Sequence, residues 1–154
     1  MRIIGIDPGL TKTGVGIIEI KNNLMSYVCS QTIYSDTTQD ISIRLKYFYD
    51  NLTTIIQTYQ PSISAIEETF LNSNPATSLK LGHARGCLIL ALALNNLKVY
   101  EYSATKIKKT ITSNGRAEKH QIQAMVKILL PKANFKSEDE ADALAVAICH
   151  YHHL

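Results

Sequence analysis

The sequence has no hydrophobic run of the length that crosses a membrane. The uncharged stretch from Gly86 to Leu97 holds twelve residues, whereas a transmembrane helix needs about 20. We therefore predict a buried helix there and no membrane partner. The N-terminus, MRIIGIDPGL, carries Arg2 and Asp7 and lacks the apolar core of a secretion signal. These features predict a cytoplasmic protein.

Cysteine is scarce and unpaired in the sequence. Cys29, Cys87 and Cys149 are odd in number, far apart, and form no CxxC motif. This pattern argues against a disulfide framework and against a zinc site. We expect each cysteine to be a small core residue in a reducing compartment.

The composition is that of one globular domain. Of the 154 residues, 45% are hydrophobic and 19% are charged, which is far from the composition of disordered chains. A chain of this length is too short for a two-domain enzyme. We expect a single domain spanning residues 1–154.

Hydrophobic periodicity predicts an α/β fold. Apolar and β-branched runs at 2–7, 13–20 and 24–34 predict a three-stranded antiparallel meander, and further strands are expected at 62–67 and 98–103. Helical spacing predicts helices at about 39–59, 74–97, 104–112, 117–130 and 137–150. This order predicts a five-stranded mixed sheet, the meander plus two parallel strands, flanked by helices.

Positive charge is concentrated in one part of the chain. The segment 98–136 has nine basic and two acidic residues, a local charge of +7, so the remainder carries −4. Clustered basic residues neutralise phosphates and release counterions, which favours a polyanion-binding face. A solvated helix face is the alternative. The basic residues are Lys98, Lys106, Lys108, Lys109, Arg116, Lys119, Lys127, Lys132 and Lys136.

Four acids stand where structure alone favours other residues. Asp7 and Glu67 end two apolar strands, where a charge is costly unless it is paired. Asp139 and Asp142 lie three apart in the last helix, on one flank. A turn at Pro-Gly would also explain Asp7, and capping by the Ser137 motif would explain Asp139. Neither explains Asp142, which lies beyond the first turn.

Gathered at one end of the sheet, four carboxylates would repel one another without cations. Hard oxygen ligands select Mg²⁺ or Mn²⁺. Such a site supports two-metal hydrolysis of a phosphodiester, with a basic surface holding the polyanionic substrate.

Five motifs occur in order along nearly the whole length of the chain: IIGIDPGLTKTGVGII, AIEETF, LKLGHARG, AEKHQIQAMV and EDEADALAVAICH. Together they resemble RuvC, the bacterial crossover junction endodeoxyribonuclease family of the ribonuclease H superfamily. The resemblance implies a ribonuclease H-like fold and a homodimer that nicks four-way (Holliday) junction DNA in recombination and repair, leaving 5′-phosphate and 3′-hydroxyl ends. It also implies two Mg²⁺ per subunit, with Mn²⁺ as a substitute, and a junction-binding and branch-migration motor of the RuvA and RuvB type as partner.

The resemblance also assigns residues. The four family acids, which bind metal and catalyse cleavage, fall on Asp7, Glu67, Asp139 and Asp142. Lys108 and Lys119 match basic residues needed for cleavage, and Phe70 matches a position that contacts bases. Glu68 and Glu140 are additional acids, and either is an alternative ligand. Candidate DNA contacts are Phe70, Lys80, Arg85, Lys108, Lys109, Arg116 and Lys119, with helix solubility as the alternative for Lys80 and Arg85.

Other functions fit parts of the sequence. The IGIDPGLTKTGVGI segment also resembles the phosphate loop of actin-like ATPases and sugar kinases, but 154 residues leave no room for their second lobe. A DNA-binding module without activity is hard to reconcile with four acids. A related ribonuclease H-like nuclease acting in RNA processing is a closer alternative. The apolar helix at 86–97 is a candidate dimer surface.

Overall fold

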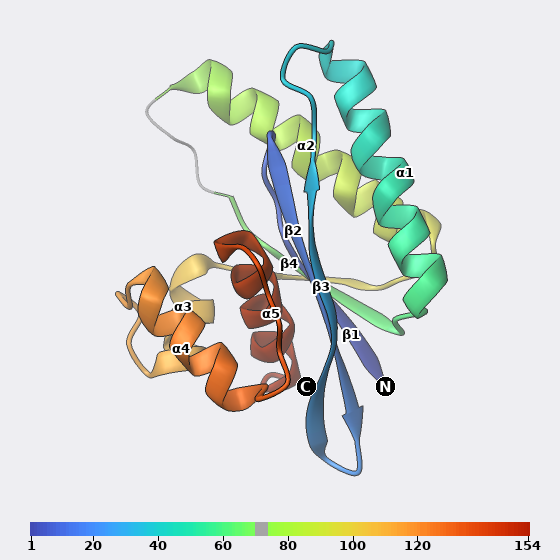
Figure 1. Cartoon of the computed structure of the whole chain (residues 1–154). Coiled ribbons are helices and arrows are strands. Elements are labelled where there is room, and N and C mark those ends of the chain that lie inside the picture. The colour runs from blue at the N-terminus through green and yellow to red at the C-terminus, as the bar shows by residue number, and fades with distance from the viewer. Residues whose placement is uncertain (70–73) are drawn as a thin grey trace.

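One mixed sheet lies between two groups of helices (Figure 1). The computed structural model describes residues 1–69 and 74–154. The strands are β1 (Arg2–Asp7), β2 (Lys12–Lys21), β3 (Leu24–Tyr34), β4 (Ile63–Glu67) and β5 (Val99–Tyr102). The helices are α1 (Ile41–Tyr59), α2 (Pro75–Leu94), α3 (Ala104–Thr112), α4 (Lys119–Leu129) and α5 (Glu138–Tyr151).

The sheet has the order β3-β2-β1-β4-β5. β1, β2 and β3 pair antiparallel, and β4 and β5 continue the sheet parallel to β1. The predicted meander and the two added parallel strands are therefore confirmed. Asn22 and Asn23 form the β2–β3 turn with φ of 52° and 60°, a conformation that asparagine tolerates better than most residues.

Two helix boundaries differ from the prediction for local reasons. α2 ends at Leu94 and not at 97, because Asn96 adopts a φ of 60° and Leu97 folds back into the core. α4 begins at Lys119, two residues later than predicted, because Glu118 and Gln121 form a capping box at its start.

Each face of the sheet has its own hydrophobic core. α1 and α2 cover one face, where Phe48, Leu52 and Leu88 pack on Ile4 and Ile6 of β1. α5 covers the other face, and α3 and α4 pack outside it. The strand period of two assigns alternate residues of β1 to alternate faces.

Glycine lets α5 lie directly on the sheet. A Cβ atom at Gly5 of β1 would stand 2.2 Å from the Ala143 carbonyl oxygen, and one at Gly14 of β2 would stand 2.0 Å from the Asp139 carbonyl oxygen. Only a residue without a side chain permits this approach. The contact fixes the height of α5 above β1 and β2, and with it the place of the acids on α5.

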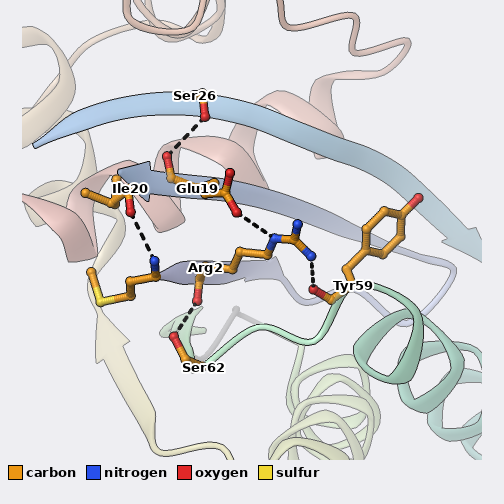
Figure 2. Close-up of polar contacts among 7 residues, drawn as sticks. Arg2, Glu19, Ile20, Ser26, Tyr59 and Ser62 are labelled. Carbon is orange, nitrogen blue, oxygen red and sulfur yellow. Dashed lines mark hydrogen bonds and ion pairs between the residues drawn. The ribbon is translucent and has the colours of Figure 1, made fainter. Parts of the chain in front are cut away.

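Arg2, at the start of β1, connects several elements at that end of the sheet (Figure 2). Its Nε donates to Glu19 Oε1 at 3.0 Å, and its Nη1 donates to the Tyr59 carbonyl at 2.7 Å. Tyr59 is the last residue of α1, where a cation also suits the helix dipole. Ser62 donates to the Arg2 carbonyl at 3.1 Å. These contacts join β1, β2, α1 and the start of β4.

Substitution of Gly5 by alanine tests the close packing of α5. We expect Gly5→Ala to lower the free energy of unfolding by about 1–3 kcal/mol, because the added methyl group meets backbone atoms that cannot rotate away. Thermal and denaturant unfolding measure the change. Gly82→Ala is the matched control: its Cβ would meet nothing within 4 Å, so helix propensity alone should leave stability equal or slightly higher. Equal stability of the two variants would contradict the packing argument.

Candidate active site

Asp7 and Glu67 lie side by side at the ends of two parallel strands. Ile6 of β1 pairs with Ile66 of β4, and the next residue of each strand is the acid. Ile6 and Ile66 belong to the core beneath α1 and α2. The acids therefore point to the opposite face, toward α5.

α5 supplies the other two acids, and they take different positions. Asp142 lines a pocket together with Asp7 and Glu67. Asp139, one turn earlier, is not among the described residues that line this pocket. Its Oδ2 lies 2.7 Å from the Lys12 Nζ at the start of β2. The predicted set of four acids thus divides into three in the pocket and one paired beside it.

The pocket encloses about 280 Å³. Lys108 of α3 and Lys119 of α4 face the three carboxylates across it. Its remaining wall is apolar and comes from the helices of the α5 face, namely Ala104, Ile107, Ile122 and Ala145. Three carboxylates, two ammonium groups and an apolar surface therefore line one pocket.

The carboxylates in this pocket are poorly compensated. Burial, and then repulsion from Glu67, Asp142 and Asp139, raises the pKa of Asp7 to about 8. Burial and the charge of Asp142 raise the pKa of Glu67 to about 7. Burial likewise raises the pKa of Asp142, against the opposing charge of Lys119. The pocket therefore gathers more carboxyl groups than its cations can keep ionised near neutral pH, which is typical of functional sites.

The residues offer the right donors for a hard divalent cation. Carboxylate oxygen is the ligand that Mg²⁺ and Mn²⁺ prefer. Within residues 1–69 and 74–154, however, no three His, Cys, Asp or Glu side chains are already gathered into a ligand cluster. The donor chemistry and the charge thus fit such an ion, but the carboxylates are not yet close enough together to coordinate one.

Lys119 and Lys108 both offset part of the negative charge of the pocket carboxylates. Lys119 is the first residue of α4, and its Nζ lies 3.0 Å from Glu138 Oε2. Its charge lowers the pKa of Asp7, Glu67 and Asp142. Lys108 does the same for Glu67 and Asp142. Both predicted lysines are therefore in electrostatic contact with the predicted acids.

The other predicted DNA contacts lie outside the pocket. Lys109 and Arg116 are exposed on α3 and on the turn that follows it, and Lys80 is exposed on α2. Arg85 is mostly buried: its Nε donates to the Glu67 carbonyl at 3.3 Å, and its guanidinium pairs with Glu101. Phe70 lies outside the described residues.

Neither additional acid is in the pocket. Glu140 is buried, and its Oε2 accepts hydrogen bonds from Ser30 Oγ at 2.8 Å and from the Lys136 backbone N–H at 3.0 Å. The backbone N–H of Glu140 donates to Ser137 Oγ, as the predicted cap requires. The Glu140 carboxylate anchors α5 to β3 and does not complete a capping box. Glu68 is likewise absent from the described pocket lining.

The sequence analysis did not identify Lys12 as a residue near the site. Its signal is its spacing from Gly14: residues two apart in a strand share a face, and Gly14 lies under Asp139. That closeness cannot be read without the register of α5 on β2.

None of the helices in the described part of the chain is both long and apolar enough to span a bilayer.

Comparisons with known proteins identify the family of this chain. The family model described as crossover junction endodeoxyribonuclease RuvC matches residues 3–150. The protein of that name from Rhizobium leguminosarum bv. trifolii is 47% identical over 152 residues, covering 99% of this chain and 90% of the relative. The one from Methylorubrum extorquens is 50% identical over 153 residues, covering 99% and 81%.

Solved structures share the fold. Thermus thermophilus RuvC, solved in complex with a Holliday junction substrate, superposes with a TM-score of 0.92 at 24% identity, covering 99% of this chain and 94% of that chain. The yeast mitochondrial Holliday junction resolvase Ydc2 gives 0.67 at 11% identity, covering 96% and 77%. The predicted ribonuclease H-like architecture is thereby confirmed. From the match of the family model and the identity over nearly its full length, the chain belongs to the RuvC family of crossover junction endodeoxyribonucleases.

Proposed function

We propose that this protein resolves four-way DNA junctions in recombination and repair by hydrolysing one phosphodiester per subunit in the pocket between β1, β4 and α5. The observation that carries the proposal is the meeting of Asp7, Glu67 and Asp142 with Lys108 and Lys119 in one hollow. The names of the relatives support the reaction class, and the junction bound to T. thermophilus RuvC supports the substrate.

Asp7, Glu67, Asp139 and Asp142 are the residues proposed to hold two Mg²⁺ ions, with Mn²⁺ as a substitute. The raised pKa values of Asp7 and Glu67 support a cation here, because bound positive charge relieves the repulsion that raises them. When bound, such ions make a hydroxide from water and stabilise the leaving oxygen. The proposed products are 5′-phosphate and 3′-hydroxyl ends.

Lys108 and Lys119 are proposed to hold the scissile phosphate. Each ammonium group faces the carboxylates across the pocket, so it can neutralise a non-bridging oxygen while the acids stay free for cations. Lys109, Arg116 and Lys80 are exposed and would contact the DNA backbone outside the pocket. We retain Phe70 as a proposed base contact. The bonds of Arg85 to Glu67 and Glu101 favour a role in positioning Glu67 over direct DNA contact.

α2 offers the surface for a homodimer. Leu79, Leu90 and Leu94 are 63%, 55% and 60% exposed, and their spacing of 11 and 4 residues places them on one face of the helix. Gly86 lies on the same face with open space around it. An exposed apolar stripe of this kind suits a self-complementary contact. Two subunits would give the two nicks that resolve a junction.

We further propose that residues 1–154 act as one domain in the cytoplasm, on junctions prepared by a motor of the RuvA and RuvB type. Support comes from the two cores sharing one sheet and from family membership.

Cleavage of a labelled synthetic four-way junction, with Mg²⁺ and with EDTA, tests the proposed function. We expect Mg²⁺-dependent paired nicks in the junction and none in a linear duplex of the same sequence. Asp7→Asn should reduce cleavage at least about a hundredfold. Junction binding should be kept, because the substitution removes a negative charge that repels the DNA phosphates. Asp50→Asn, an exposed acid on α1 paired with Lys46, is the control and should cut normally. Equal cutting of both DNAs would instead indicate a general nuclease.

The pH dependence of stability tests the charge cluster without DNA. A carboxyl with a raised pKa keeps its proton in the folded protein after the unfolded chain has lost it, so stability falls as pH rises between those two pKa values. Asp7 and Glu67 place this window between about pH 4 and 8. From pH 5 to 8 the metal-free protein should lose on the order of a few kcal/mol, Asp7→Asn clearly less, and Mg²⁺ should restore the loss. Identical pH profiles for wild type and Asp7→Asn would refute the assignment.

The dimer surface is tested by Leu90→Glu. A charge in the centre of an apolar contact should leave monomers of 17.1 kDa, where the wild type gives twice that mass at micromolar concentration by light scattering. Leu24→Glu, at an exposed leucine of the β2–β3 hairpin, is the control and should stay dimeric. A monomeric wild type would rule out the proposed dimer at that concentration.

A further inference from the structure

Of the four acids proposed to hold metal, Asp139 lies outside the described pocket lining and is paired with a lysine. Its Oδ2 lies 2.7 Å from Lys12 Nζ. The Asp139 side chain is 14% exposed and that of Lys12 is 49% exposed, so the lysine approaches from solvent. The described pocket lining contains Asp7, Glu67 and Asp142 but not Asp139.

The backbone explains why Lys12 reaches Asp139. Gly14 lies so close to α5 that its missing Cβ would overlap the Asp139 carbonyl. Lys12 precedes Gly14 by two residues, and side chains two apart in a strand point to the same face. Lys12 therefore projects toward the first turn of α5.

The turn before Lys12 is itself fixed. Thr13 is fully buried, and its Oγ1 donates to the Gly9 carbonyl at 3.0 Å and accepts from the Gly9 N–H at 3.3 Å. A Cβ on Gly9 would stand 2.1 Å from the Lys12 carbonyl oxygen. The β1–β2 turn is thus tightly closed, and Lys12 leaves it in a defined direction.

From these contacts we infer that Lys12 is a positioning residue that binds Asp139 in the free protein and competes with a divalent cation for its carboxylate. This inference rests on the proposed metal site. Lys12 supplies one positive charge to an acidic cluster that otherwise faces only Lys108 and Lys119 among the pocket-lining cations described. A cation that binds Asp139 displaces the ammonium group, and this exchange lowers the apparent affinity for the metal.

The test is Mn²⁺ and Mg²⁺ binding to the full chain without DNA, measured by titration calorimetry. We expect Lys12→Met to bind the cation about fivefold more tightly than the wild type, the change that corresponds to the upper end for a partly exposed ion pair. Lys12→Arg keeps the ion pair and should match the wild type. Lys46→Met removes an equal charge and an ion pair on α1, and it should leave metal affinity unchanged.

A double-mutant cycle separates the direct contact from a general effect of charge. In an Asp139→Asn background, Lys12→Met should change cation affinity by less than about twofold, because the group that Lys12 holds is gone. An equal gain in both backgrounds would overturn the inference and leave only long-range electrostatics. Unchanged affinity of Lys12→Met in the wild-type background would overturn it as well.

The same titration distinguishes failure of this inference from failure of the metal site. If the wild type and every Lys12 variant bind neither Mn²⁺ nor Mg²⁺, the proposed site itself is wrong, and the inference falls with it. Because the Lys12 side chain is half exposed, we expect the variants to fold. Lys12→Gln, which keeps a polar side chain without charge, should repeat the result of Lys12→Met.

Discussion

The contact of α5 with the glycines of β1 and β2 is the constraint on which the site depends. Backbone atoms of α5 occupy the space where side chains of Gly5 and Gly14 would lie. Because a helix this close cannot shift without a clash, the first turns of α5 have a fixed height above the strand ends. Asp142 is thereby held next to Asp7 and Glu67. The gathering of these three acids thus follows from the packing of small residues.

Polar contacts around this core set the direction of α5 and of β4. Glu140 binds Ser30 of β3 and the Lys136 N–H, which ties the start of α5 to the edge strand β3. Arg85 binds the carbonyl of Glu67 and the side chain of Glu101, which ties α2 to the ends of β4 and β5. These charged residues position the elements that carry Asp139 and Glu67, the acids proposed to bind metal.

The acidic pocket costs the folded protein stability. Buried carboxylates without full compensation are unfavourable, and the raised pKa values of Asp7, Glu67 and Asp142 reflect that cost. The two hydrophobic cores offset this cost, because most of α5 is buried between the sheet and α3 and α4. Strain of this kind is typical of functional sites, where a ligand supplies the missing charge.

The sequence by itself determined the five strands, the five helices to within a few residues, and the two strand-end acids, because hydrophobic periodicity follows from local pattern. Asp7 and Glu67 meet since each ends a strand of a parallel pair. Only the tertiary structure decided how α5 sits on β2. That contact separates Asp139 from Asp142, gives Asp139 the partner Lys12, and turns Glu140 toward β3. The reason is physical: side chains at neighbouring positions of one helix project in different directions, and only packing selects the residues that they contact.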